Sequence, residues 1–367
     1  MTHDDGMGVR VGLMGAGSAG DLYLRHARYG CSLRYVACAD VEPSRAAALA
    51  RAHGGLRPCT PREMLANPEV DIVLNLTPAP EHGWVGRQVL LAHKHLYTEK
   101  PLAPDMRQGA RLLAMARRRG LRVGAAPDTF LGRALQTARR LIDAGEIGAP
   151  FAAAATVTNP PPFAWHPRPA QFFGEAAGPL FDMGPYYLTA LVFLLGPVAR
   201  VAGFGTVAPC ERASLTGERI LPGVPTHEVG VLEFATGAVA TLHASFDAAL
   251  SAAPPIEVHG TMATLRLPDP DTSGGTLLLC PQGEREWTEV PLAPVGGRSR
   301  CIGIEDMAAA IREHRPHRAC GELALHVLDV MELLRRSASA GRTLAVRTTC
   351  GRPAPLPVHH PELVGCL

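Results

Sequence analysis

Residues Val9–Gly20, VRVGLMGAGSAG, place a glycine-rich turn directly behind a short apolar run. The run predicts a buried strand, and the residues that follow the turn predict a helix. Gly15 permits the tight turn, Gly17 lets the backbone approach a pyrophosphate, and Gly20 lets the helix pack on the strand. The order of strand, turn and helix therefore predicts a site for a dinucleotide.

Residues behind this turn complete the predicted site. Ser18 and Ala19 supply N–H groups at the start of the helix, where the helix dipole favours phosphates. Asp40 ends a second predicted strand, 20 residues after Gly20. A carboxylate there accepts hydrogen bonds from the adenosine ribose and repels a 2′-phosphate, so the sequence favours NAD over NADP. The alternative is that Asp40 only caps the helix that begins near Pro43.

Composition excludes several classes of protein. A length of 367 residues predicts two domains. The net charge of +2, with both signs interspersed, argues against nucleic-acid binding. The nine cysteines form no CxxC pair and the 15 histidines show no clustered spacing, so we expect neither a disulfide framework nor a metal site. No apolar stretch suits a signal peptide or a membrane span, so we expect a soluble, cytoplasmic protein without a membrane partner.

The predicted elements divide the chain in two. Strand and helix signals alternate up to Pro127, which predicts a doubly wound parallel sheet, whereas strands without intervening helices then predict a large, mostly antiparallel, open sheet. The expected fold is α/β: a dinucleotide-binding Rossmann domain at 1–126, an α+β domain for substrate binding and oligomerisation at 127–350, and a proline-rich tail at 351–367. An uncovered sheet face usually becomes an interface, so we expect a homodimer or a homotetramer.

The segment Thr98–Pro101, TEKP, is the first candidate for chemistry. It follows a short predicted strand of the parallel sheet. Ligands bind beyond the carboxyl ends of such strands, so Lys100 is expected to point into the crevice. The alternative is a solvated lysine. Pro101 makes the bond that precedes it a candidate for the cis form, because cis peptide bonds are nearly confined to X–Pro.

The second candidate is Gly178–Tyr187, GPLFDMGPYY. Asp182 is expected to be the N-cap of a helix, and Tyr186 lies four residues later on the same side. Tyr187 lies about 100° round the helix and faces elsewhere. A phenol with an ordinary pKa near 10 is a poor base, and an adjacent ammonium such as Lys100 would lower that pKa. The alternative is that Asp182 only caps and Tyr186 only packs.

The third candidate is Trp165-His166, which follows a proline-rich loop. Its flat indole and imidazole rings suit the border of a nicotinamide or a sugar ring. His166 is either a general acid or an ordinary surface group, because loop histidines beside prolines take both roles.

These motifs resemble the Gfo/Idh/MocA oxidoreductases, and the resemblance covers roughly residues 9–347. It implies that Lys100, from an EKP motif, acts at the reacting hydroxyl. It also implies that Asp182 and Tyr186 form the family's DxGxY motif, the tyrosine variant of DxGxH. Further cofactor contacts are expected from residues that match the family's cofactor segments and from the loop tryptophan: Thr77, Pro78, His82, Glu99, Lys100 and Trp165.

The chain departs from the family pattern in two places. Ala176-Ala177-Gly178 stands where the family commonly has three glycines, which reshapes the substrate loop. Pro127-Asp128-Thr129-Phe130 replaces an Asn-Arg pair after the last Rossmann strand, which removes a nicotinamide or substrate contact.

The sequence thus predicts an NAD(P)-dependent oxidoreductase that interconverts a secondary alcohol and a ketone on a small polyhydroxylated molecule, namely a sugar, a cyclitol or a glycoside. In oxidation Tyr186 would take the hydroxyl proton, Lys100 would stabilise the alkoxide, and Asp182 would hold the partners in line. Two alternatives stay open. A tightly bound NAD would serve transiently in epimerisation, elimination or glycosidic cleavage, or the chain is a non-catalytic ligand sensor on a Rossmann scaffold.

Overall fold

The computed structural model describes residues 8–27, 33–159, 161–164, 166, 169–174, 176–294 and 300–357. The predictions made for Trp165 and for the tail beyond 357 lie outside these residues. The chain divides into two compact units. The described residues of the first unit are those up to Leu131, 300–325 and 356–357, and the second unit holds 132–294 and 326–355.

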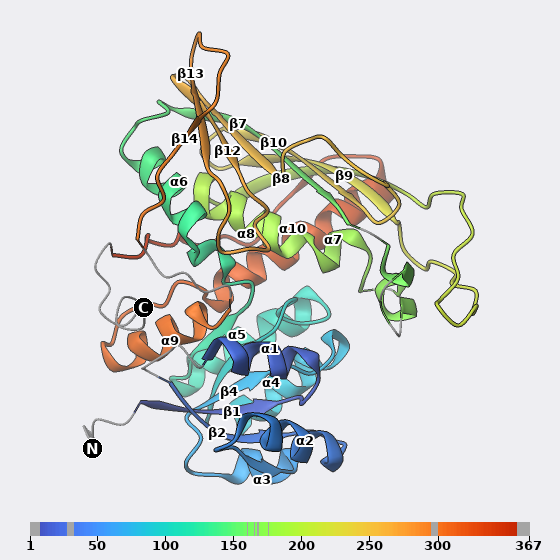
Figure 1. Ribbon diagram of the computed structural model, residues 1–367, viewed down its shortest axis with the longest axis vertical. Coiled ribbons are helices and arrows are strands. Elements are labelled where there is room, and N and C mark those ends of the chain that lie inside the picture. Colours follow the sequence, from blue (N-terminus) through green and yellow to red (C-terminus); the bar gives the residue numbers. More distant parts are fainter. Residues whose placement is uncertain are drawn as a thin grey trace. The chain divides into compact units, whose positions relative to one another are not determined.

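The described part of the first unit contains a six-stranded sheet in the order β3-β2-β1-β4-β5-β6 (Figure 1). Every strand pair in it is parallel. The order reverses between β1 and β4, which is where doubly wound sheets bind ligands. The strands are β1 (Val9–Met14), β2 (Leu33–Ala39), β3 (Arg57–Cys59), β4 (Ile72–Asn75), β5 (His95–Thr98) and β6 (Val123–Ala125). The helices are α1 (Ser18–Ala27), α2 (Pro43–His53), α3 (Pro61–Ala66), α4 (His82–Leu91), α5 (Met106–Arg119) and α9 (Ile302–Arg312), with short 3₁₀ turns at Ala79–Glu81 and Thr129–Leu131.

Local sequence signals explain where these elements begin and end. All four residues of β4 are buried, as expected of a strand covered on both faces of a parallel sheet. Thr60 and Glu63 form a capping box at the start of α3. Asp105 caps α5, and Gly120 ends that helix in the left-handed conformation with a φ of 65°. The predicted doubly wound domain is therefore confirmed.

The described part of the second unit contains a nine-stranded sheet in the order β14-β13-β12-β11-β7-β10-β9-β8-β15. Its pairs are antiparallel except for β7 with β10. The strands are β7 (Pro150–Thr158), β8 (Val198–Thr206), β9 (His227–Phe234), β10 (Val239–Ser245), β11 (Ile256–Gly260), β12 (Ala263–Leu267), β13 (Leu278–Pro281), β14 (Thr288–Glu289) and β15 (Leu344–Ala345). The helices are α6 (Arg133–Asp143), α7 (Pro179–Asp182), α8 (Gly184–Leu195) and the part of α10 (Gly321–Ala340) from His326 onward, with 3₁₀ turns at Pro162–Ala164 and Pro169–Phe173.

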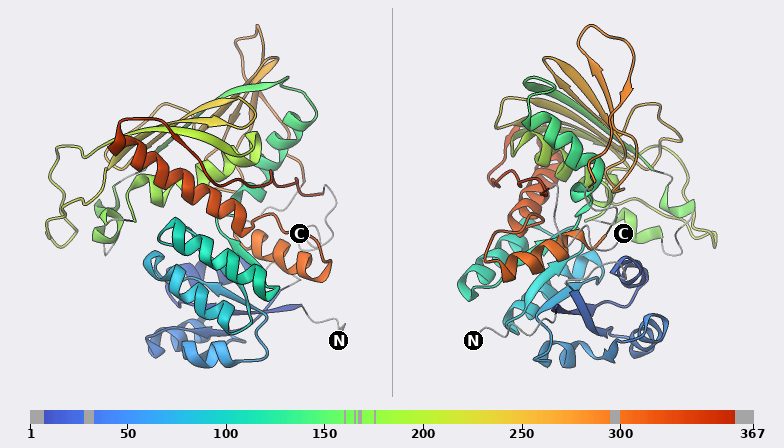
Figure 2. Two further views of the ribbon diagram at one scale, coloured as in Figure 1. Left: turned by 180° about the vertical axis from the view of Figure 1, so that it is seen from behind. Right: turned by 60° about the vertical axis from the view of Figure 1, so that its left-hand side comes forward.

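Helices cover one face of this second sheet (Figure 2). Successive side chains of each strand point alternately toward the helices and toward the other, uncovered face. In β9, Val229 and Val231 are exposed on the uncovered face, whereas Leu232 is buried. Phe204 of β8 is 77% exposed and Phe151 of β7 is 56% exposed. The mostly antiparallel open sheet is confirmed. Its uncovered face exposes these apolar side chains and also two ion pairs, Arg200 with Glu233 and Arg266 with Glu257.

The structure differs from the sequence-based expectations in two respects. α9 belongs to the first unit and packs near β6, although it follows the second sheet in sequence. The strand β3 was not predicted, because it is short and lacks an alternating apolar pattern. β3 even contains Pro58, which has no N–H for a ladder.

Candidate active site

The surroundings of Gly15, Gly17 and Gly20 show why the turn between β1 and α1 has a glycine at each position. Gly15 has a φ of 107°, and an added Cβ would lie 2.6 Å from the carbonyl of Leu76. A Cβ on Gly17 would meet no described atom within 4 Å, so the backbone there is open to an approaching group. A Cβ on Gly20 would lie 3.2 Å from Leu49 of α2 and from the Gly15 carbonyl oxygen. The turn thus keeps a bare backbone at the start of α1, as phosphate binding requires.

The Asp40 carboxylate lies against this turn. Its Oδ2 accepts the N–H of Ala16 at 2.8 Å, and its Oδ1 accepts the N–H of Glu42 at 2.9 Å. Asp40 is therefore fixed at the end of β2, beside the turn, where the sequence predicted a ribose contact. A carboxylate has about four lone-pair positions, so these two bonds leave acceptor capacity for a ribose.

Asn75 joins the carboxyl ends of two neighbouring strands. Its side-chain amide donates to Thr98 Oγ1 at 3.1 Å, and its Oδ1 accepts from the Thr77 hydroxyl at 2.7 Å. Asn75 and Thr98 are fully buried, whereas Thr77 is half-buried and Pro78 is exposed. The predicted cofactor residues Thr77 and Pro78 thus lie at the sheet edge, and a buried amide that sequence reasoning did not single out holds them there.

His82 is buried between two loops at the carboxyl edge of the sheet. It is 1% exposed, and its ring nitrogens lie 2.6 Å from the carbonyl oxygen of Pro101 and 2.8 Å from that of Thr77. Burial lowers the pKa of His82 below its ordinary value. Both ring nitrogens face main-chain oxygens, so His82 ties the loop at Thr77 to the loop at Pro101, and its cofactor contact stays a prediction.

Glu99 and Lys100 follow β5 directly. Glu99 accepts the hydroxyl of Tyr23 in α1 at 2.8 Å and the N–H of Lys100 at 3.1 Å. The Lys100–Pro101 bond is cis, which confirms the form suggested by the sequence. Lys100 follows β5 at the carboxyl edge of the sheet and is half-buried, so it is not enclosed in the core.

Asp128 is a buried carboxyl that follows β6. It is 1% exposed, and its Oδ2 accepts the N–H of Gly303 near the start of α9 at 2.8 Å. Burial raises the pKa of Asp128 to about 6, and the nearby Glu99 adds to the rise. Sequence reasoning recorded this position only as a departure from a family pattern, because nothing in the local sequence shows that the carboxyl is buried.

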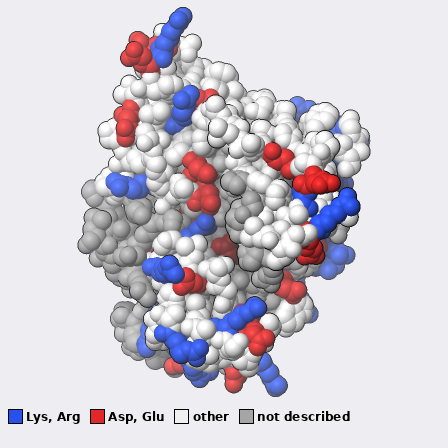
Figure 3. All heavy atoms as spheres, turned by 45° about the vertical axis from the view of Figure 1, so that its right-hand side comes forward, with Lys and Arg blue, Asp and Glu red and all other residues white. Residues whose placement is uncertain are grey.

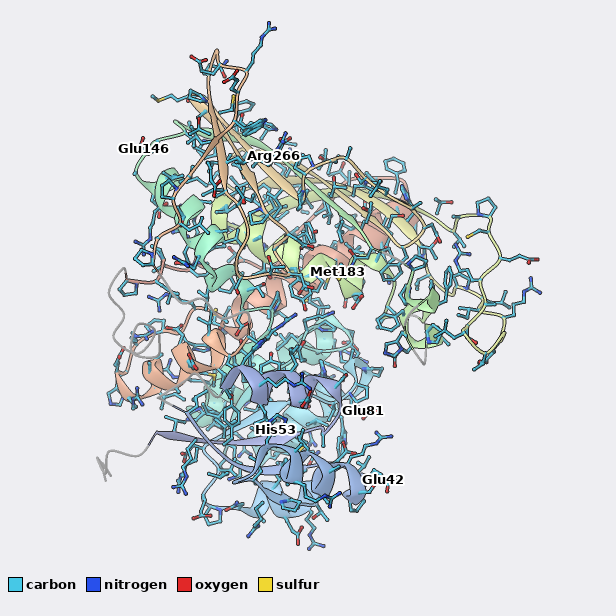
Figure 4. The ribbon with its side chains drawn as sticks, in the orientation of Figure 1. Glu42, His53, Glu81, Glu146, Met183 and Arg266 are labelled. Atoms are coloured by element: carbon cyan, nitrogen blue, oxygen red, sulfur yellow. The ribbon has the colours of Figure 1, made fainter. Side chains whose placement is uncertain are left out.

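The segment around Asp182 corrects one prediction. Gly178, with a φ of 85°, and Pro179 start the one-turn helix α7, and Asp182 is its last residue. Met183, labelled in Figure 4, occupies the N-cap position of α8, so Asp182 is not that helix's N-cap. The reason is that Gly178 and Pro179 start a helix one turn before the position at which Asp182 was expected to be an N-cap.

The two tyrosines of α8 are both buried but differ in surroundings. Tyr186 is 5% exposed and its N–H donates to the Met183 carbonyl at 3.1 Å. The hydroxyl of Tyr187 donates to Asp269 Oδ1, in the loop after β12, at 3.2 Å. Burial raises the pKa of Tyr187 strongly and the neighbouring Asp269 raises it further, which excludes Tyr187 as a base near neutral pH.

The His166 loop is held by aromatic side chains. The His166 ring meets the ring of Phe172 edge-on at a centroid distance of 4.9 Å, and the His166 N–H donates to Pro162. Phe173 stacks on Phe163 and meets Phe246 edge-on at 6.0 Å. His166 is half-buried on an anchored loop, which is compatible with either of its predicted roles.

Surface charge, metal-binding side chains and membrane-spanning helices were each expected from the sequence to show no special feature. On the face drawn in Figure 3, Lys and Arg side chains lie interspersed with Asp and Glu. Among the described residues, no three His, Cys, Asp or Glu side chains come together as a metal site would require. No helix in the described part of the chain is both long and apolar enough to cross a bilayer.

Comparison with known protein families shows which family this chain belongs to. Residues 9–126 match the oxidoreductase family with an NAD-binding Rossmann fold, and residues 135–266 match the GFO/IDH/MocA C-terminal domain. The chain belongs to the Gfo/Idh/MocA oxidoreductase family. NAD is accordingly the cofactor of its first unit. The open backbone at Gly17, the N-terminus of α1 and the Asp40 carboxylate beside the turn all fit that dinucleotide.

Several relatives are similar over part or all of the chain. The dTDP-3,4-didehydro-2,6-dideoxy-alpha-D-glucose 3-reductase of Streptomyces violaceoruber is 39% identical over 142 residues, 38% of this chain and 40% of that reductase. The match thus spans less than half of that enzyme. The trans-1,2-dihydrobenzene-1,2-diol dehydrogenase of Bos taurus is 27% identical over 337 residues, 88% of this chain and 91% of that enzyme.

Solved structures share the fold. Levoglucosan dehydrogenase in complex with NADH has a TM-score of 0.80 at 19% identity, over 93% of this chain and 100% of that one. An NAD binding oxidoreductase from Klebsiella pneumoniae has a TM-score of 0.80 at 23% identity, over 92% of this chain and 99% of that one. At these identities the likeness shows a shared fold.

Proposed function

We propose that this chain uses NAD to interconvert a secondary alcohol and a ketone on a sugar, a cyclitol or a glycoside. The observation that carries the proposal is the Glu99-Lys100-Pro101 segment at the carboxyl end of β5, at the edge where the cofactor loops meet. The proposed partners Asp182 and Tyr186 belong to α7 and α8. Relatives named as a 3-reductase of a dTDP-linked deoxy sugar and as an inositol 2-dehydrogenase support the choice of substrate class.

Each residue has a distinct role in the proposed reaction. When bound, the nicotinamide supplies the hydride chemistry. Lys100 stabilises negative charge that develops on the substrate oxygen, because the attraction of an ammonium placed there strengthens as the proton leaves. Tyr186 takes the hydroxyl proton in oxidation and returns it in reduction. Asp182 holds Lys100 or the substrate hydroxyl in line.

A substrate panel tests the activity. Sugars, inositols and glycosides are offered with NAD and with NADP, and absorbance of the reduced nicotinamide is followed. Net accumulation of NADH with one of these substrates is the expected result. Turnover without net NADH would indicate that the cofactor is used transiently and would replace the proposed net oxidation.

Variants of Lys100 and Tyr186 test the assignment. Lys100→Ala and Tyr186→Phe should each lower turnover by roughly 10²–10⁴-fold, the usual contribution of a positioned acid–base group. Binding of NAD should barely change. The double variant should lose much less than the product of the single losses, because residues that act as a unit are not additive. If Tyr186→Phe keeps its turnover while His166→Ala loses it, the proton donor is His166.

A further inference from the structure

A buried ion pair lies beside the segment that leads into α7. Arg335 of α10 binds Glu228 of β9 through two bonds, Nε to Oε1 at 2.7 Å and Nη2 to Oε2 at 3.0 Å. The side chains of Arg335 and Glu228 are 17% and 6% exposed. The pair therefore has the two-pronged geometry that fixes a guanidinium in direction as well as in position.

Both members of this pair also bind the α7 segment itself. Arg335 donates to the carbonyl of Ala177, and its guanidinium carbon lies 4.4 Å from the centroid of the Phe181 ring. Glu228 Oε2 accepts the N–H of Leu180 at 3.2 Å. The pair thus holds residues 177–181 through a carbonyl, an N–H and an aromatic face.

Gly178 shows how closely the segment is fitted to Arg335. Its φ is 85°, and an added Cβ would lie 2.7 Å from Arg335 Nη2. A residue with a side chain would be strained there and would collide with the guanidinium. The close approach of backbone and guanidinium explains the glycine that ends Ala176-Ala177-Gly178.

α7 needs such external support. It is a single turn of four residues, and its N-cap residue Gly178 makes no side-chain cap bond among the described residues. A helix of one turn is not stable on its own, and its first N–H groups have no partner within the helix. Glu228 supplies an acceptor for one of those groups, that of Leu180.

We infer that the Glu228–Arg335 pair is a positioning device that sets the place of Asp182 and of the start of α8, where Tyr186 lies. This inference rests on the proposed function of those two residues. The pair does not touch the reacting groups: it fixes the residues from 177 to 181, and the chain passes from there directly into Asp182. Loosening it would shift Asp182 and Tyr186 relative to the substrate without removing them.

The chain contains a matched control at the other end of α8. Arg139 of α6 pairs with Asp143 at 2.7 Å, lies 4.9 Å from the Phe193 ring centroid and donates to the Phe193 carbonyl at 2.8 Å. It is 6% exposed. Arg139 thus makes the same three kinds of contact as Arg335, but it supports the C-terminal end of α8.

The experiment compares Arg335→Ala with Arg139→Ala in the full-length protein. With Arg335→Ala, kcat should fall by roughly 10- to 100-fold, the scale on which a misplacement of about 1 Å acts. The affinity for NAD should not change. With Arg139→Ala, kcat should stay near the wild-type value although stability falls. Hydrogen exchange should accelerate at amides 178–186 in Arg335→Ala and at the end of α8 in Arg139→Ala.

Chemical rescue adds a readout that a merely structural role would not give. A cavity of about 340 Å³ lies against the pair, lined by Leu180 and Leu334 among others, and its rim includes the exposed Phe204. Ethylguanidinium can reach the space left by Arg335→Ala through this cavity. Millimolar ethylguanidinium should therefore restore part of the kcat of Arg335→Ala and leave Arg139→Ala unchanged.

Arg335→Lys covers the case in which Arg335→Ala does not fold. Lysine keeps the charge opposite Glu228 but loses the fork that reaches Ala177 and the flat face on Phe181, so kcat should still fall. Normal kcat and normal exchange at 178–186 in Arg335→Lys and Arg335→Ala would overturn the inference. If Lys100→Ala and Tyr186→Phe keep full turnover, the proposed function fails instead, and the exchange measurement still tests the pair.

Discussion

Asp128→Asn should make the stability of the first unit less sensitive to pH. In the folded protein burial raises the pKa of Asp128 to about 6, whereas its ordinary value is 3.8. Between about pH 4 and pH 6, Asp128 therefore keeps its proton in the folded state but has released it in the unfolded chain. Stability consequently falls as pH rises from about 4 to about 6 and stays at the lower level above that range. Asparagine carries no charge and removes this dependence.

The magnitude follows from the two pKa values. A gap of about 2 at 1.36 kcal/mol per pKa unit corresponds to about 3 kcal/mol of stability lost by the wild type at high pH. Part of this loss has already occurred at about pH 5, because the unfolded carboxyl is ionised there. Between about pH 5 and pH 7.5 the difference in unfolding free energy between Asp128→Asn and wild type should therefore grow by about 1.5 kcal/mol in favour of the variant.

The asparagine introduced by Asp128→Asn can keep the existing contact. Its side-chain oxygen can accept the Gly303 N–H, as Asp128 Oδ2 now does at 2.8 Å. Among the described residues, neither Asp128 Oδ1 nor the Tyr97 hydroxyl has a hydrogen-bond partner. A Cβ added to Gly303 would lie 2.1 Å from that hydroxyl and 2.7 Å from Asp128 Cβ, so both groups flank the same residue. The new amide thus has an acceptor nearby.

Urea unfolding at a series of pH values measures the effect. Asp105→Asn is the control, because the pKa of Asp105 is lowered and asparagine is an equally good N-cap. Its difference from wild type should stay flat between pH 5 and 7.5, because Asp105 is ionised throughout in both states. A flat difference for Asp128→Asn as well would refute the buried, proton-holding state of Asp128.

Three further predictions concern the cofactor, Tyr187 and assembly. NAD should bind more tightly than NADP. Asp40→Ala should narrow the difference between the two affinities and should also lower the affinity for NAD, because Asp40 fixes the turn through Ala16. Titration of both cofactors measures these affinities, and a wild-type preference for NADP would make Arg45 the phosphate partner. Tyr187→Phe should keep kcat but lower the unfolding free energy by about 1 kcal/mol, the typical net value of one hydrogen bond, which thermal unfolding measures. The protein should form a homodimer or a dimer of dimers through the uncovered face of the second sheet, where apolar side chains such as Phe204, 77% exposed, would be buried. Light scattering that finds a monomer at micromolar concentration would contradict this.

Much of the first unit was predictable because its signals are local. The apolar run, three glycines and Asp40 occur within about 30 residues, and each acts through backbone geometry that adjacent residues impose. The same holds for the capping box of α3 and for Gly120 at the end of α5. The position of Lys100 at the sheet edge followed in turn, because the carboxyl ends of parallel strands share one edge, whereas Thr77 was expected there only from the family resemblance.

Sequence patterns did not predict the surroundings of Asp182 and His82. Asp182 has the composition of an N-cap, but Gly178 and Pro179 start a helix before it and make Asp182 the last residue of a turn. His82 lies at the position of a loop ligand, yet its ring is buried between two carbonyls. For Asp182 the competing signal is local, whereas the partners of His82 are carbonyls of other segments, whose path the sequence does not state.

The amino-acid sequence alone determined the dinucleotide fold, the family motifs and the residues that carry charge to the sheet edge. Only the tertiary structure decided which of those charges are buried and what they hold. Glu228 and Arg335 are 107 residues apart, and Asp128 and Gly303 are 175 apart. Burial and the partners of a charge depend on segments brought together by folding, so the pKa of Asp128 and the support of α7 have no local signature in the chain.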